Sequence, residues 1–141
     1  MDKICAYCGR LGLTKEDAYS TKEHIVPDFM IQDEKDKMES VFFERKLSFK
    51  NAPVINDVCN YCNNGVLSEL DAYIKNNLYD TFFDNITYDS KILKYDFNLL
   101  SRWLLKVSYN DMRIAQKDKA FDVYSLDIIE YILGIKNELH Q

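Results

Sequence analysis

Hydrophobic positions follow a helical pattern in the second half of the chain. A helix is predicted directly after residue 62, because apolar residues recur there at steps of three and four: Leu67, Leu70, Ile74 and Leu78. Another helix is predicted after Asp96, with an apolar side made of Leu99, Leu100, Trp103, Leu104 and Val107. A last helix is predicted from Ser125, whose side chain can cap it, and its predicted core residues are Leu126, Ile129, Ile132 and Leu133.

The first half of the chain favours extended structure. Residues 1–27 predict a tight turn punctuated by Gly9 and Gly12, followed by a short strand that ends at Pro27. The segment 41–49 is rich in Val, Phe and Leu and predicts one strand, and a further extended piece is predicted over 53–58. The highly charged run 31–40 predicts a solvent-facing loop or a short helix.

Composition and charge limit the classes of protein that fit this pattern. With 141 residues, 47% of them hydrophobic and 13% aromatic, the chain can fold around one core, which excludes wholesale disorder. Its net charge of −5 argues against coating nucleic acid by bulk positive charge but allows a local basic stripe. We find no run of 18 apolar residues and no apolar signal-peptide core, so we expect a soluble, cytoplasmic protein without membrane contact.

The four cysteines form two Cys-x-x-Cys pairs, Cys5 with Cys8 and Cys59 with Cys62. This spacing lets two thiolates of one turn face a single tetrahedral ion, and two such pairs favour a structural zinc site. Four thiolates leave no open position for water, so this zinc would not be catalytic. Two disulfides and a redox dithiol are the alternatives. Fifty residues separate the pairs, more than in many zinc ribbons, so a sizeable segment is inserted between them.

The inserted segment contains Lys-Glu-His-Ile-Val-Pro at 22–27, and the second pair reads Cys-Asn-Tyr-Cys-Asn-Asn-Gly. Together these motifs resemble the HNH endonuclease family of ββα-metal nucleases, in the subgroup held by a zinc on four cysteines. The match covers 5–71, and 102–110 resembles the C-terminal part of some bacterial members. The resemblance implies an α+β fold: a zinc-stapled, treble-clef-like module over 1–79 with a helical C-terminal extension over 80–141 packed on it.

Hydrolysis of a phosphodiester requires an activated water and neutralised charge at the phosphate. A neutral histidine suits the first task, and carboxylate and amide oxygens suit Mg²⁺ or Mn²⁺ for the second. The resemblance implies that His24 is the general base and that Glu23 and Asn63 bind the catalytic metal. Asn63 capping the next helix is the structural alternative. The family's central Asn, which orients the base, falls at Val54 here; Asn56 is the preferred substitute, and Asn51 is the other nearby Asn.

A basic stripe is predicted on the helix after Asp96, because steps of four, four and three place three cations and one amide on one face: Arg102, Lys106, Asn110 and Arg113. The stripe can bind DNA phosphates, or it is an ordinary solvated face. We therefore expect a metal-dependent DNA endonuclease in bacterial or phage DNA processing or defence, with RNA as a further possible substrate and a protein partner as a possible requirement. The alternative is a non-catalytic zinc module that binds DNA or a protein.

Overall fold

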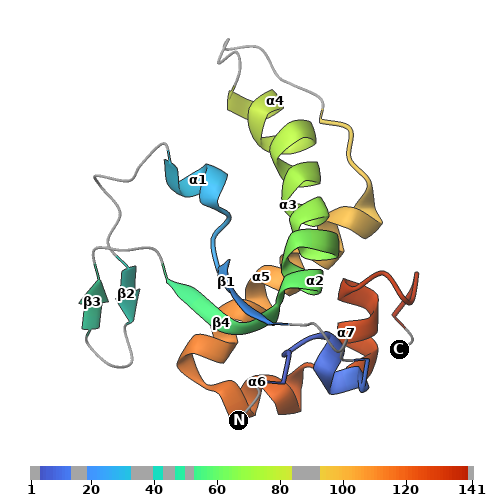
Figure 1. The fold of residues 1–141 in the computed structure, drawn as a ribbon. Coiled ribbons are helices and arrows are strands. Elements are labelled where there is room, and N and C mark those ends of the chain that lie inside the picture. The colour runs from blue at the N-terminus through green and yellow to red at the C-terminus, as the bar shows by residue number, and fades with distance from the viewer. Residues whose placement is uncertain are drawn as a thin grey trace.

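The structure is a computed structural model that describes residues 4–13, 19–32, 40–42, 47–49, 53–83 and 93–139. The chain mixes short antiparallel strands with helices (Figure 1). The strands are β1 (Ser20–His24), β2 (Ser40–Phe42), β3 (Leu47–Phe49) and β4 (Val54–Cys59). The helices are the 3-10 turn η1 (Cys8–Leu11), α1 (Asp28–Gln32), α2 (Asn60–Cys62), α3 (Ser68–Ile74), α4 (Asp80–Phe83), α5 (Phe97–Ala115), α6 (Lys117–Val123) and α7 (Leu126–Ile132).

Strands β1 and β4 pair antiparallel, and the chain passes from β4 directly into α2 (Figure 1). The register places Glu23 opposite Ile55 and His24 opposite Val54, with an irregularity between Thr21 and Glu23. The extended segment predicted over 53–58 is therefore confirmed, and so is the strand before Pro27, although it ends at His24. Two strands and the following helix form the strand–strand–helix unit on which the candidate site is built.

The single strand predicted over 41–49 is wrong. The segment contains β2 and β3, which pair with each other so that Ser40 lies opposite Phe49. Three consecutive charged residues, 44–46, interrupt the apolar run in the sequence, and each apolar half forms its own strand. Most of the charged run 31–40 lies outside the described residues.

The helix predicted after residue 62 is confirmed and extends to Phe83. Helices α2, α3 and α4 follow one another, joined by two π-helical segments, Asn63–Leu67 and Lys75–Tyr79. Gly65 departs from helical geometry at φ −99° and ψ −115°, which kinks the chain near its start. The predicted inner face is correct at its first three positions, because Leu67, Leu70 and Ile74 are buried.

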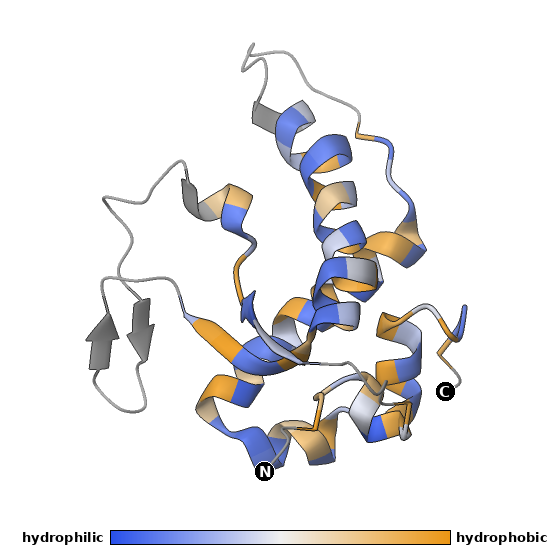
Figure 2. Cartoon of the chain, viewed as in Figure 1, coloured by the Kyte–Doolittle hydropathy of each residue, from blue (hydrophilic) through white to orange (hydrophobic). Residues whose placement is uncertain are grey.

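Helix α5 begins where predicted, and the side chain of Asp96 caps it by accepting the Leu99 N–H at 3.0 Å. Its predicted inner face is correct only in part, because Leu99, Leu100, Trp103 and Val107 are partly buried. Leu104 is 53% exposed, whereas the buried positions are Lys106, Tyr109, Asn110 and Arg113. In Figure 2, hydrophilic and hydrophobic residues are interspersed along the long helices. The polar side chains of Lys106, Asn110 and Arg113 can occupy the inner face because each of them has hydrogen-bonding or charged partners there.

Helix α7 starts after Ser125, as predicted, but Ser125 makes no side-chain capping bond and Leu126 is 49% exposed. Ile129 and Ile132 are fully buried. They join a single core that unites the N-terminal turn, β4 and the C-terminal helices: Tyr7, Val58, Leu67, Tyr109, Ala120, Tyr124, Ile129 and Ile132. In the described part of the chain, no helix is long and apolar enough to cross a membrane.

The core predicts different effects for two Leu→Ala substitutions in helical segments. Leu67 is fully buried, so Leu67→Ala should lower the free energy of unfolding by about 2–5 kcal/mol through lost burial and a cavity. Leu104→Ala should change it by less than about 0.5 kcal/mol, because Leu104 is half exposed. Urea unfolding followed by circular dichroism measures both. Equal losses would mean that α5 packs with its apolar side inward.

Candidate functional site

The four cysteines converge from three elements of the fold. Cys5 precedes η1, Cys8 begins it, Cys59 ends β4 and Cys62 ends α2. Their sulfur atoms all lie within 4.8 Å of one another, and the Sγ atoms of Cys8 and Cys59 are 3.6 Å apart. A tetrahedral zinc with Zn–S bonds of about 2.3 Å requires sulfur–sulfur separations of about 3.8 Å. All four are free thiols, so the cluster can hold a structural metal such as zinc, as the spacing predicted.

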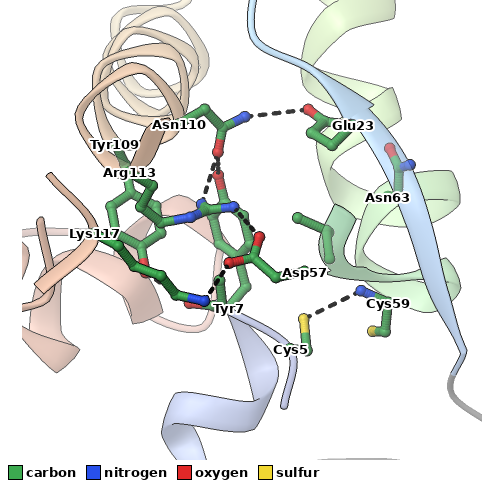
Figure 3. Close-up of polar contacts among 12 residues, drawn as sticks. Cys5, Tyr7, Glu23, Asp57, Cys59, Asn63, Tyr109, Asn110, Arg113 and Lys117 are labelled. Carbon is green, nitrogen blue, oxygen red and sulfur yellow. Dashed lines mark hydrogen bonds and ion pairs between the residues drawn. The ribbon is translucent and has the colours of Figure 1, made fainter. Parts of the chain in front are cut away.

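Electrostatics within the cluster favour a bound cation. A hydrogen bond from Cys62, opposed by burial, lowers the pKa of Cys5 to about 4. Burial and the nearby Cys5 charge raise the pKa of Cys8 to about 12. The thiols alone therefore stabilise one thiolate and resist a second, whereas a divalent cation would stabilise all four. The backbone N–H of Cys59 donates to the Cys5 sulfur at 3.4 Å, a bond of the kind that orients metal ligands (Figure 3).

The Glu23–His24 pair lies at the end of β1 with its two side chains in different surroundings. Glu23 is only 4% exposed, and its carboxylate points toward α5 (Figure 3). His24 is half-buried and lies opposite Val54 in the strand pair. Successive residues of a strand point to opposite faces, so β1 presents the carboxylate to the interior and the imidazole to the other face of the sheet.

Asn63 directly follows the last cysteine and is bound to β1. Its Nδ2 atom donates to Thr21 Oγ1 at 2.8 Å and to the carbonyl oxygen of Lys22 at 2.9 Å. A carbonyl can only accept, so the amide nitrogen must face β1, and Oδ1 has no hydrogen-bond partner in the described chain. Asn63 has helical dihedrals, φ −65° and ψ −51°, and does not cap the helix.

Glu23 belongs to a buried ion network centred on Lys106. The Lys106 ammonium is fully buried and lies 2.7 Å from Glu23 Oε1 and 2.7 Å from Asp71 Oδ2. The indole N–H of Trp103 donates to the other Asp71 oxygen at 2.9 Å. Burial raises the pKa of Glu23, and the Lys106 charge opposes this rise. Asp71 was not predicted as a site residue, because its partners Trp103 and Lys106 are 32 and 35 positions away in the sequence and no local pattern links them.

The network continues through Asn110. Its Nδ2 atom donates to Glu23 at 3.4 Å, and its Oδ1 atom accepts from the Tyr7 hydroxyl and from Arg113 Nη1 (Figure 3). The other end of the Arg113 guanidinium donates to Asp57 at 2.7 Å. Burial tends to raise the pKa of Asp57, but the charges of Arg113 and Lys117 together hold it below its usual value. The sheet, the N-terminal turn and α5 are therefore joined by ion pairs and hydrogen bonds as well as by apolar packing.

The basic stripe predicted on α5 is not a solvent-facing surface. Lys106 is fully buried, Arg113 is 4% exposed, and both pair with carboxylates inside the fold. Arg102 is partly buried and donates from Nε to the Ile132 carbonyl at 3.1 Å. The prediction of exposure is wrong because helical spacing places cations on one face without revealing whether carboxylates of other elements cover that face.

Asn56, the residue expected to orient the proposed base His24, makes no direct contact with it that would support this role. Asn56 is exposed on β4, two residues beyond the Val54 that faces His24, and no hydrogen bond between Asn56 and His24 exists in the structure. Asn51 lies outside the described residues. The role of Asn56 stays a prediction.

Comparisons of the chain with protein-family models, with curated proteins and with solved structures found no match in any of the three. The site must therefore be interpreted from its own geometry.

The buried ion network predicts that Lys106 matters for stability. Lys106→Met should lower the free energy of unfolding by about 3–5 kcal/mol, because it leaves the Glu23 and Asp71 carboxylates without their shared cation. The matched control is Lys75→Met, which removes an exposed ion pair with Asp80 and should cost less than about 1 kcal/mol. Chemical denaturation measures both. A Lys106 variant as stable as the Lys75 variant would show that the triad contributes no net stability.

Proposed function

We propose that this protein is an HNH-type endonuclease, a zinc-stapled ββα-metal enzyme that hydrolyses phosphodiester bonds in DNA. His24 is the general base, and Glu23 and Asn63 hold the catalytic divalent metal. The observation that best supports this proposal is the attachment of Asn63 to β1, through Thr21 and the Lys22 carbonyl, beside the Glu23–His24 pair. The motif resemblance in the sequence supports the family assignment.

The cysteine cluster supports the proposal by fixing the strand–strand–helix unit. Cys59 ends β4 and Cys62 ends α2, so a metal there would hold the start of the long helix against the strand pair. Asn63 follows Cys62 immediately, and its amide nitrogen is bound to β1. His24 and the Asn63 oxygen therefore belong to one braced unit, as a catalytic pair must.

Two oxygen atoms are available to a hard divalent cation. Asn63 Oδ1 has no hydrogen-bond partner in the described chain, and the contacts of Glu23 with Lys106 and Asn110 both go to Oε1, which leaves Oε2. Carboxylate and amide oxygens are the ligands that Mg²⁺ and Mn²⁺ prefer. When bound, the metal would neutralise charge on the scissile phosphate.

His24 would accept the proton of the attacking water. A histidine has a neutral, basic form near pH 7, and His24 is half-buried with its backbone in the strand pair. Lys106 holds the neighbouring Glu23 carboxylate in place from the opposite face of β1. The base and the metal ligand are thereby supported by separate sets of contacts.

A non-catalytic zinc module that binds DNA or a protein is the second candidate. The observation that favours it is the Lys106 ion pair, which already neutralises the Glu23 carboxylate that a metal would use. The net charge of −5 also opposes tight binding of DNA without a partner. An RNA substrate, a protein partner and a place in bacterial or phage DNA processing or defence are further parts of the proposal that rest on the resemblance.

Cleavage of supercoiled plasmid in Mg²⁺ or Mn²⁺ tests the proposal. The wild type should nick the plasmid, and His24→Ala should reduce the rate by about 10²–10⁴-fold, the usual cost of losing a general base. The matched control is His140→Ala, the other histidine of the sequence, which should cut at the wild-type rate. Metal dependence is tested by omitting the divalent ion, because a chelator would also remove a metal from the cysteine cluster.

The outcomes separate the two candidates. Nicking by the wild type and by His140→Ala, but not by His24→Ala, supports the nuclease. A folded, zinc-loaded wild type that leaves the plasmid intact and shifts it in a gel supports the binding module. Equal cleavage by all three proteins would contradict the assignment of His24.

A further inference from the structure

A pocket of about 720 Å³ lies beside β4, between the N-terminal turn and helices α5 and α6. It is separate from the Lys106 ion triad, and its lining includes Arg10, Asn56, Asp57, Arg113, Lys117 and Phe121. Figure 3 shows three of these residues, Asp57, Arg113 and Lys117, meeting at one point. The function proposed above uses none of the charged residues of this pocket.

The pocket concentrates positive charge in an acidic protein. Arg10, Arg113 and Lys117 line it, and Asp57 is the one carboxylate among the described residues of its lining. Asp57 is shared between Arg113 at 2.7 Å and Lys117 at 3.1 Å, so its single negative charge serves two cations. Cys5 also lines the pocket, and counting it as a thiolate leaves a surplus of one positive charge among the described lining residues, although the whole chain carries −5. Such a local surplus favours an anion.

The cationic side chains of the pocket have more N–H donors than their contacts within the protein use. Arg10 donates from Nη1 to the Tyr109 hydroxyl and from Nη2 to the Phe121 carbonyl, both uncharged acceptors, and a guanidinium has five N–H donors. The Lys117 side chain is 54% exposed and its contact with Asp57 engages one of three ammonium protons. Arg113 is buried, and its Nε atom has no hydrogen-bond partner among the described residues. A phosphate group can accept the remaining bonds of Arg10 and Lys117.

The outer wall of the pocket is apolar. Ile4 is 71% exposed and Val54 is 40% exposed, and both line the pocket. Asn56, between the apolar rim and Asp57, offers an amide that can donate and accept, as the polar edge of a nucleobase requires. Phe121 supports the guanidinium of Arg10, which lies 4.8 Å from the ring centre. The wall thus suits a ligand with an anionic end and a flat, mostly apolar end.

We propose that this pocket binds a nucleotide, with its phosphate on Arg10 and Lys117 and its base against Ile4 and Val54. The nucleotide can be free or one unit of a nucleic-acid strand. A strand as the source rests on the proposed function, because Val54 faces His24 in the strand pair and links the pocket to the proposed base. Binding of a free nucleotide does not depend on the nuclease.

Calorimetric titration of the full-length, zinc-loaded protein tests the pocket, with deoxyadenosine 5′-monophosphate and a twelve-residue oligothymidylate as probes. Lys117→Gln should weaken binding on the order of tenfold, the effect of losing one charge-assisted hydrogen bond. The matched control is Lys119→Gln, an exposed lysine on the same helix that lies outside the pocket lining, and it should change binding about twofold or less. Deoxyadenosine, which lacks the phosphate, should bind at least about tenfold more weakly.

Each outcome of the titration either supports or overturns the proposed nucleotide site. Selective weakening of binding by Lys117→Gln supports the proposed nucleotide site. If this weakening is seen with the oligonucleotide alone, the bound nucleotide is one unit of a nucleic-acid strand. Three results would overturn the proposed nucleotide site: equal effects of the two substitutions, equal binding of deoxyadenosine and its monophosphate, or binding of neither probe. Circular dichroism and zinc content establish that both variants are folded. A wild type that binds the probes but does not cleave plasmid overturns the nuclease and leaves the pocket standing.

Discussion

Convergence of four sulfur atoms within 4.8 Å is the constraint on which the rest of the structure depends. It joins the N-terminal turn to the end of β4 and the start of the long helix, across fifty intervening residues. A metal held there would contribute directly to folding, because the thiolates that bind it come from segments far apart in the sequence. Tyr7, between the first two cysteines, is carried into the core against Tyr109, with ring centres 5.2 Å apart.

A second, electrostatic junction binds α5 to this unit. Glu23 of β1 and Asp57 of β4 pair with Lys106 and Arg113, and Asn110 connects the two pairs. A fully buried lysine is tolerated here because two carboxylates share its charge. The same contact bears on function, since Lys106 occupies one oxygen of the carboxylate that the proposed nuclease needs for its metal.

Local spacing predicted much of this architecture. The two Cys-x-x-Cys pairs, the strand before Pro27, the extended segment over 53–58 and the starts of the helices were visible because each depends on residues close in sequence. The inner face of α5 was not predictable in this way. Lys106 has partners 35 and 83 positions away, and helical periodicity alone favours the side that contains Leu104. For the candidate site, the sequence indicated Asn63, but only the fold shows that its nitrogen faces β1.

Zinc X-ray absorption spectroscopy on the purified full-length chain tests the central junction most directly. We expect one zinc per chain with four sulfur neighbours at about 2.3 Å. Cys62→Ser should replace one sulfur by a lighter neighbour or lose the metal. Protein that holds no zinc and contains two disulfides, or a spectrum dominated by oxygen and nitrogen neighbours, would contradict a fold built on a four-cysteine metal site.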